Sequence, residues 1–213
     1  MKKTVSLITL VFAFVITNAQ TSSKAENLLT KVAEKMAAFD NMYFKFKYVL
    51  ENKEVDIKQE TEGVIYTESE KYNLSFMNNS FIYDGVNTYI IVPEDEEVNI
   101  IDGSSDEDLL NPTKLLFFYQ EGFTYEWQAS KTVNGKSIQF IKLNPIDTDA
   151  ESSHFSIGID TKNNIISSIS ETGNNGTVTT FTIQEFKANQ TISKNLFIFD
   201  EAKYQKENYT INK

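Results

Sequence analysis

Alternation of apolar and polar residues runs through most of this chain in short segments. In residues 44–51, FKFKYVLE, aromatic or aliphatic side chains occupy every second position, and the positions between them are mostly Lys or Glu. Because successive side chains of a β-strand point to opposite faces, this period of two predicts strands with one buried face. Turn-forming pairs such as Asp84-Gly85 and Asn134-Gly135 separate the segments and favour tight antiparallel hairpins.

The alternating segments predict a mainly β protein built from about a dozen antiparallel strands. So many short strands in one chain favour a sheet that is closed or nearly closed. The expected strands lie at 43–51, 61–68, 71–77, 80–84, 87–92, 97–101, 123–130, 137–143, 153–160, 164–171, 177–187 and 196–199.

Two segments have helical spacing instead. Over residues 24–39, apolar side chains recur every three or four positions with charged residues opposite them, which predicts an amphipathic helix. Further on, Asn111 is an expected N-cap and Pro112 an expected first helical residue, and Gly122 ends the segment. This second, short helix is apolar around much of its circumference, so we expect it to lie against an apolar surface.

The first residues read as a secretory signal peptide. Two lysines precede an apolar run of about a dozen residues, and small residues end at Ala19. The run is shorter than the roughly 20 residues that a membrane-spanning helix needs. We therefore expect cleavage after Ala19, export of the chain, and a single domain over residues 20–213.

Composition excludes several classes of function. The chain has no Cys, so it offers neither a disulfide framework nor a thiolate metal site. It carries 20 basic and 30 acidic residues, a net charge of −10, which disfavours nucleic acid and anionic membrane surfaces as partners. Every basic residue is Lys, so no guanidinium is available to clamp a phosphate or carboxylate.

Candidates for catalysis are few. His154 is the one histidine, Ser152 would share its face of a strand, and no G-x-S-x-G pattern marks a nucleophile. The pair Asp147 and Asp149 and the acidic run 94–97 fall in expected turns, where charge runs are usually solvated. The loop 102–108 alternates possible calcium ligands but lacks the Gly and Glu of an EF-hand. We expect no enzymatic activity, no metal and no cofactor.

Five stretches are distinctive in their order and spacing, and they are spread along nearly all of the chain after residue 20. In order along the chain, they are AENLLTKVAEKMAAFDNMYFKFKY, TEGVIYTESEKYNLSF, SFIYDGVNTYIIVPEDEEVNI, NPTKLLFFYQEGFTY and ISSISETGNNGTVTTFTIQEFKANQTISKNLFIFD. In this arrangement the chain resembles the LolA family of periplasmic outer-membrane lipoprotein carrier proteins, in its Bacteroidetes-like branch. Characterised members use an arginine beneath a helical lid to govern opening, and this chain departs from them because it has no arginine.

The resemblance implies an unclosed antiparallel β-barrel of about 11 strands, capped by the N-terminal amphipathic helix and the short internal helix. It implies a monomeric carrier of lipoprotein acyl chains or other lipids. Its partners would be an inner-membrane lipoprotein-releasing transporter and an outer-membrane acceptor. The apolar cavity would be lined by Leu29, Val32, Met36, Phe44, Phe46, Tyr48, Leu74, Phe76, Ile90, Leu116 and Phe118.

Two other readings stay open on the sequence alone. One is an interaction module of the same fold that senses lipids. The other is a secreted β-rich hydrolase or glycan-binding protein, which would need convergent polar groups in a cleft.

Overall fold

The structure is a computed structural model that describes residues 22–103 and 112–213. The expected signal peptide, residues 104–108 of the acidic loop, and Asn111 lie outside the described residues. Contacts divide the chain into two compact units. The first unit comprises Met1–Ala37 and Tyr119–Val178, and the second comprises Ala38–Phe118 and Thr179–Lys213.

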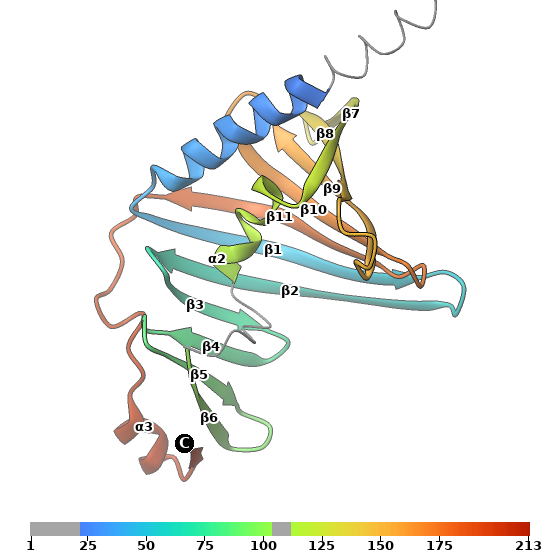
Figure 1. Cartoon of the computed structure of the whole chain (residues 1–213). Coiled ribbons are helices and arrows are strands. Elements are labelled where there is room, and N and C mark those ends of the chain that lie inside the picture. Colours follow the sequence, from blue (N-terminus) through green and yellow to red (C-terminus); the bar gives the residue numbers. More distant parts are fainter. Residues whose placement is uncertain (1–21, 104–111) are drawn as a thin grey trace, which may run out of the picture. The chain divides into compact units, whose positions relative to one another are not determined.

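The described residues form twelve strands in one unclosed sheet (Figure 1). In hydrogen-bonding order they run β12-β6-β5-β4-β3-β2-β1-β11-β10-β9-β8-β7. The expectation of a mainly β fold with an unclosed sheet is confirmed, and β1 to β11 match the first eleven expected strands closely. The strands are β1 (Asn41–Asn52), β2 (Ile57–Glu68), β3 (Lys71–Phe76), β4 (Asn79–Tyr83), β5 (Asn87–Val92), β6 (Glu97–Asp102), β7 (Phe123–Val133), β8 (Lys136–Pro145), β9 (Ser152–Asp160), β10 (Ile165–Gly173), β11 (Val178–Ala188) and β12 (Thr210–Asn212).

The expected strand at 196–199 is wrong. Its backbone turns instead, because the amide of Leu196 donates to the Ser193 carbonyl at 3.1 Å and the amide of Ile198 donates to the Asn195 carbonyl at 3.2 Å. Phe197 anchors the segment, since it is only 4% exposed, whereas Ile198 is 57% exposed. The twelfth strand is β12 near the C-terminus, which pairs with β6 in parallel, so the sheet is not wholly antiparallel.

Both expected helices are present with altered bounds. The first runs over residues 22–37 rather than 24–39. The second is split into α2 (Pro112–Leu115) and the 3-10 turn η1 (Phe118–Gln120), because the amide of Phe117 bonds back to the Lys114 carbonyl in a turn. No helix among the described residues has the length and apolar character needed to cross a membrane.

The first unit buries one stripe of its helix and the facing residues of its strands. Along the helix the buried positions are Ala25, Leu29, Val32, Ala33 and Met36, spaced as an amphipathic helix requires. On one face of strands β8 and β9, Ile141, Leu143, Ile157 and Ile159 are fully buried, and Ile138 is buried on the opposite face. Burial of this stripe, rather than intrinsic propensity, is what holds such a helix in place.

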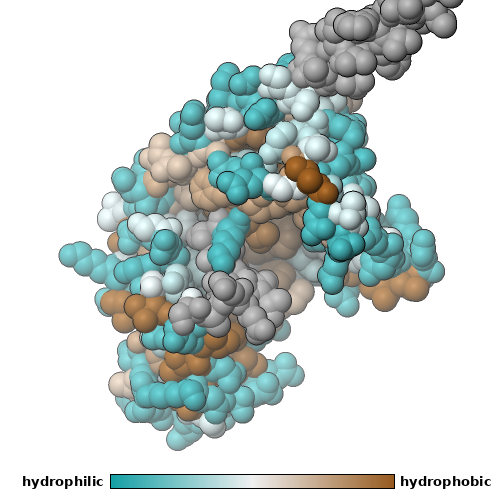
Figure 2. All heavy atoms as spheres, in the orientation of Figure 1, coloured by the Kyte–Doolittle hydropathy of each residue, from teal (hydrophilic) through white to brown (hydrophobic). Residues whose placement is uncertain are grey.

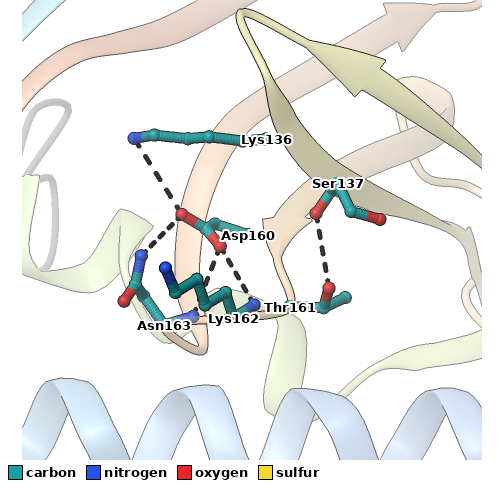
Figure 3. A network of polar contacts seen from close by, with 6 residues as sticks. All are labelled: Lys136, Ser137, Asp160, Thr161, Lys162 and Asn163. Carbon is teal, nitrogen blue, oxygen red and sulfur yellow. Dashed lines mark hydrogen bonds and ion pairs between the residues drawn. The ribbon is translucent and has the colours of Figure 1, made fainter.

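A polar network closes the β9–β10 hairpin in the first unit (Figure 3). The Asp160 carboxylate accepts hydrogen bonds from the Lys162 amide at 3.0 Å, the Asn163 amide at 3.3 Å and Asn163 Nδ2 at 2.8 Å. Lys136 Nζ lies 3.9 Å away. The turn expected at residues 162–164 is therefore confirmed, and a buried aspartate caps it.

In the second unit, the C-terminal segment covers one face of β4, β5 and β6. Buried residues Ile82, Ile91 and Val98 pack against partly buried side chains of that segment. These are Phe199, Tyr204, Tyr209 and Ile211. The segment includes α3 (Glu201–Lys206), whose N-cap Asp200 accepts from the Lys203 amide at 3.0 Å. The C-terminal segment thus covers one face of this part of the sheet.

Candidate functional site

The opposite face of the second unit's sheet carries a continuous row of apolar residues. Residues that pair across adjacent strands point to the same face. The register links Phe44 to Ile65, Leu74, Phe81 and Ile90 on successive strands from β1 to β5. A second row runs from Phe46 through Gly63 to Phe76. With Tyr48 two residues further along β1, six of the expected cavity residues share this face.

Aromatic rings gather at one end of this face. The rings of Phe46 and Tyr48 both contact Phe76, with centroids 5.7 and 5.3 Å apart, and both contact Phe181 of β11, at 5.8 and 5.2 Å. Nearby, Phe186 lies 5.0 Å from Phe44. We call the surface formed by these six residues the aromatic face: Phe44, Phe46, Tyr48, Phe76, Phe181 and Phe186.

Gly63 makes the aromatic contacts across β2 possible. It lies between Phe46 on β1 and Phe76 on β3, and a Cβ built at Gly63 would overlap the Phe46 ring. Glycine within a strand often marks a place where another group approaches closely. Here the missing side chain lets the Phe46 ring lie over the β2 backbone and reach Phe76.

The aromatic face is only partly covered by the protein itself. Phe44 and Phe46 are buried, whereas Tyr48, Phe76, Phe181 and Phe186 remain half-buried. Aromatic rings bury large areas when they find a partner, so half-buried rings gathered on one face offer apolar surface to a ligand. Figure 2 shows residues of high hydropathy, in brown, gathered over strands of the second unit.

The reverse side of β1 and β2 is polar, as the alternation predicted. Lys45 Nζ lies 2.9 Å from Glu62 Oε2, and Lys47 Nζ lies 2.7 Å from Glu60 Oε2. These pairs are well exposed and contribute little to stability. They identify the side of these two strands that faces water.

The remaining expected cavity residues lie on helical segments. Leu29, Val32 and Met36 are buried at 0–3% exposure within the first unit. Leu116 is buried and Phe118 half-buried, both in the second unit. Their assignment to one cavity with the strand residues stays a prediction.

Sequence reasoning missed Gly63, Phe181 and Phe186. A glycine inside the otherwise β-forming string TEGVIY was the available signal for Gly63. The two phenylalanines are five residues apart, so simple parity along β11 assigns them to opposite faces, although both rings contact residues of the aromatic face.

The catalytic candidates do not assemble into a triad in the part of the chain that the structure describes. The Ser152 hydroxyl donates to Glu171, and His154 Nδ1 lies 3.0 Å from the hydroxyl of its neighbour Ser153. Burial, helped by nearby Lys142, lowers the pKa of His154 below its usual value. Asp147 and Asp149 are exposed, as expected, and no group of three or more potential metal ligands occurs among residues 22–103 and 112–213.

A family model described as outer membrane lipoprotein carrier protein LolA matches residues 72–200. The chain belongs to the LolA family. The matched region includes Phe76, Phe181 and Phe186 of the aromatic face. No curated protein sequence matches the chain.

Two solved structures share the fold of this chain, and a third is similar to it with a lower TM-score. An uncharacterized conserved protein from Thermus thermophilus has a TM-score of 0.55 at 8% identity, covering 88% of this chain and 98% of that one. The lipoprotein LppX from Mycobacterium tuberculosis has a TM-score of 0.51 at 13% identity, covering 80% and 98%. A LolA superfamily protein from Nitrosomonas europaea has a TM-score of 0.43 at 9% identity, covering 83% and 98%.

Proposed function

We propose that this LolA-family protein is a periplasmic carrier that binds the acyl chains of lipoproteins and ferries them towards the outer membrane. The observation that carries the proposal is the aromatic face, a gathering of half-buried rings on one side of the second unit's sheet. The described residues offer no assembled catalytic triad to compete with a binding role. Family membership supplies the class of cargo.

The strength of such binding follows from the area of acyl chain removed from water. Each buried methylene contributes about 0.8 kcal/mol. An acyl chain lying along rings such as Phe76 and Phe181 would be desolvated on one side, so its binding stays weaker than full enclosure would make it. A carrier needs this intermediate affinity, because an acceptor must be able to bind the acyl chain more tightly and take it over.

The proposed route has a donor and an acceptor. We propose that an inner-membrane lipoprotein-releasing transporter supplies the cargo and that an outer-membrane acceptor receives it. The signal peptide expected at residues 1–19 supports export of the carrier to the compartment between the two membranes.

Capture of an acylated probe tests this proposal. Native mass spectrometry of protein purified from periplasm, followed by titration with a palmitoylated peptide, should show a bound acyl group. Phe76→Glu places a charge on the aromatic face and should abolish capture. Ser75→Glu is the matched control, because Ser75 is exposed, adjacent on β3 and points to the other face.

The comparison is decisive provided that both variants fold. Circular dichroism and thermal unfolding establish this before titration. Equal binding of the probe by wild type and Phe76→Glu would show that the aromatic face only packs within the protein. The proposal that it carries acyl chains would then be wrong.

A further inference from the structure

A hollow of about 450 Å³ lies between the helix of residues 22–37 and strand β7, within the first unit. Its lining residues belong to the first unit, whereas the residues of the aromatic face belong to the second. Five lining residues come from one flank of the helix, and the sixth comes from β7. The lining residues are Ser23, Lys24, Asn27, Leu28, Lys31 and Trp127.

All four polar side chains of this lining can donate hydrogen bonds. Lys24 and Lys31 carry ammonium groups, Asn27 an amide and Ser23 a hydroxyl. None of the six is a carboxylate, and neither lysine forms a salt bridge within the part of the chain that the structure describes. The hollow therefore presents two positive charges.

Trp127 supplies the apolar wall. Its ring is half-buried, and Lys24 Nζ lies 4.0 Å from the ring centroid, a cation–π distance. A flat ring beside a positive charge suits a ligand with an anionic group attached to a short carbon skeleton. The volume falls within the range of small-ligand sites, about 300–1,000 Å³.

We propose that this hollow binds an anionic phosphate ester, with Lys24 and Lys31 neutralising the phosphate and Trp127 packing against the attached carbon skeleton. Lysine binds phosphates as a point charge, so the absence of arginine from the chain does not prevent recognition. The net charge of −10 repels anions at long range. The two lysines supply positive charge at the hollow itself, where their attraction for an anion acts within the Debye length of about 8 Å in physiological salt.

The same chemistry occurs in free glycerol phosphates and in the headgroups of phospholipids. Binding of either kind of ligand can be measured through Trp127, because it is the chain's single tryptophan and its emission reports this hollow in the intact protein. We would titrate the carrier with glycerol 3-phosphate, with phosphatidylcholine vesicles, and with vesicles that also contain phosphatidylglycerol.

A saturable change in Trp127 emission is expected with at least one anionic probe, and it should weaken as salt rises. The double variant Lys24→Gln/Lys31→Gln should weaken binding at least tenfold. Lys53→Gln/Lys206→Gln is the matched control, because it removes the same charge from two exposed lysines outside the hollow and should bind as wild type does.

The pattern of responses decides the outcome. A response to glycerol 3-phosphate that needs Lys24 and Lys31 supports the proposal with a free ester as ligand, and one seen only with phosphatidylglycerol supports it with a lipid headgroup. No saturable response, an equal response to phosphatidylcholine alone, or equal weakening in the control pair overturns it. Retained capture of the palmitoylated peptide by Lys24→Gln/Lys31→Gln would show that the two sites act separately.

Discussion

The ring of Phe46 lies over Gly63 on the neighbouring strand β2, at a place where even one added carbon would overlap it. A cross-strand partner with a side chain would push the ring away from the sheet. The glycine therefore determines how closely the rings of Phe46 and Phe76 approach each other across β2.

Gly63→Ala should consequently disturb the aromatic face. Overpacking of this kind typically costs about 1–3 kcal/mol, and here the cost falls on the Phe46 ring or on the β2 backbone. We expect a lower free energy of unfolding in urea and weaker capture of a palmitoylated peptide. Ser75→Ala, an exposed change on β3, should alter neither quantity. An unchanged stability of Gly63→Ala would mean that the Phe46 ring moves aside freely.

Asp160 should make stability depend on pH at the acidic end. Burial raises the pKa of Asp160, but the hydrogen bonds from Asn163 and Lys162 outweigh it and hold the pKa below its usual value. A carboxylate with a lowered folded pKa stabilises the fold above its unfolded pKa, about 3.9. That contribution is lost as pH falls through the folded value.

Asp160→Asn tests this contribution. At neutral pH the variant should be less stable by about 1–3 kcal/mol, since it loses charge-assisted hydrogen bonds within the β9–β10 turn. The difference from wild type should shrink below about pH 4. Thermal unfolding measured from pH 2 to pH 7 gives the stability difference at neutral pH and its decrease at low pH. A pH-independent difference would rule out the carboxylate charge as the cause.

The C-terminal segment should be coupled to β5 through stacked rings. Phe199 stacks on Tyr89 with centroids 4.5 Å apart and an interplanar angle of 17°, and Tyr204 stacks on Phe199 at 5.3 Å. A double-mutant cycle of Tyr89→Leu and Phe199→Leu should give a coupling energy of about 0.5–1.5 kcal/mol.

Period-two alternation, with turn residues between the segments, was sufficient to predict β1 to β11. In β2 and β3 one face is more buried than the other, whereas the last four residues of β9 are buried on both faces. The alternation failed at 196–199, where Phe197 anchors a turning segment, and at β12, whose three residues carry too little pattern to be recognised. Local composition does not encode pairing with a distant strand such as β6.

The aromatic face was predictable in part for the same reason. Strand parity places Phe44, Phe46 and Tyr48 on one side, and the register of β2 and β3 then brings Phe76 beside them. Parity cannot account for Phe181 and Phe186 together, and it cannot show that a glycine lies beneath a ring. Those features depend on how adjacent strands are aligned, which one sequence does not fix.

Thr67 is a polar residue buried on the same side of the sheet as the aromatic face, so it tests how a buried hydroxyl affects stability there. Its side chain lies in the cross-strand row of Met42 and Tyr72 and is 1% exposed, and its hydroxyl has no hydrogen-bond partner among the described residues. An unsatisfied buried hydroxyl costs about 1–3 kcal/mol, so Thr67→Val should match or exceed wild-type stability. Thr67→Ala should lose stability, since it also removes a packed methyl group. Urea unfolding of the two variants separates the effects: a loss in Thr67→Val as large as that in Thr67→Ala would show that the hydroxyl is satisfied in solution.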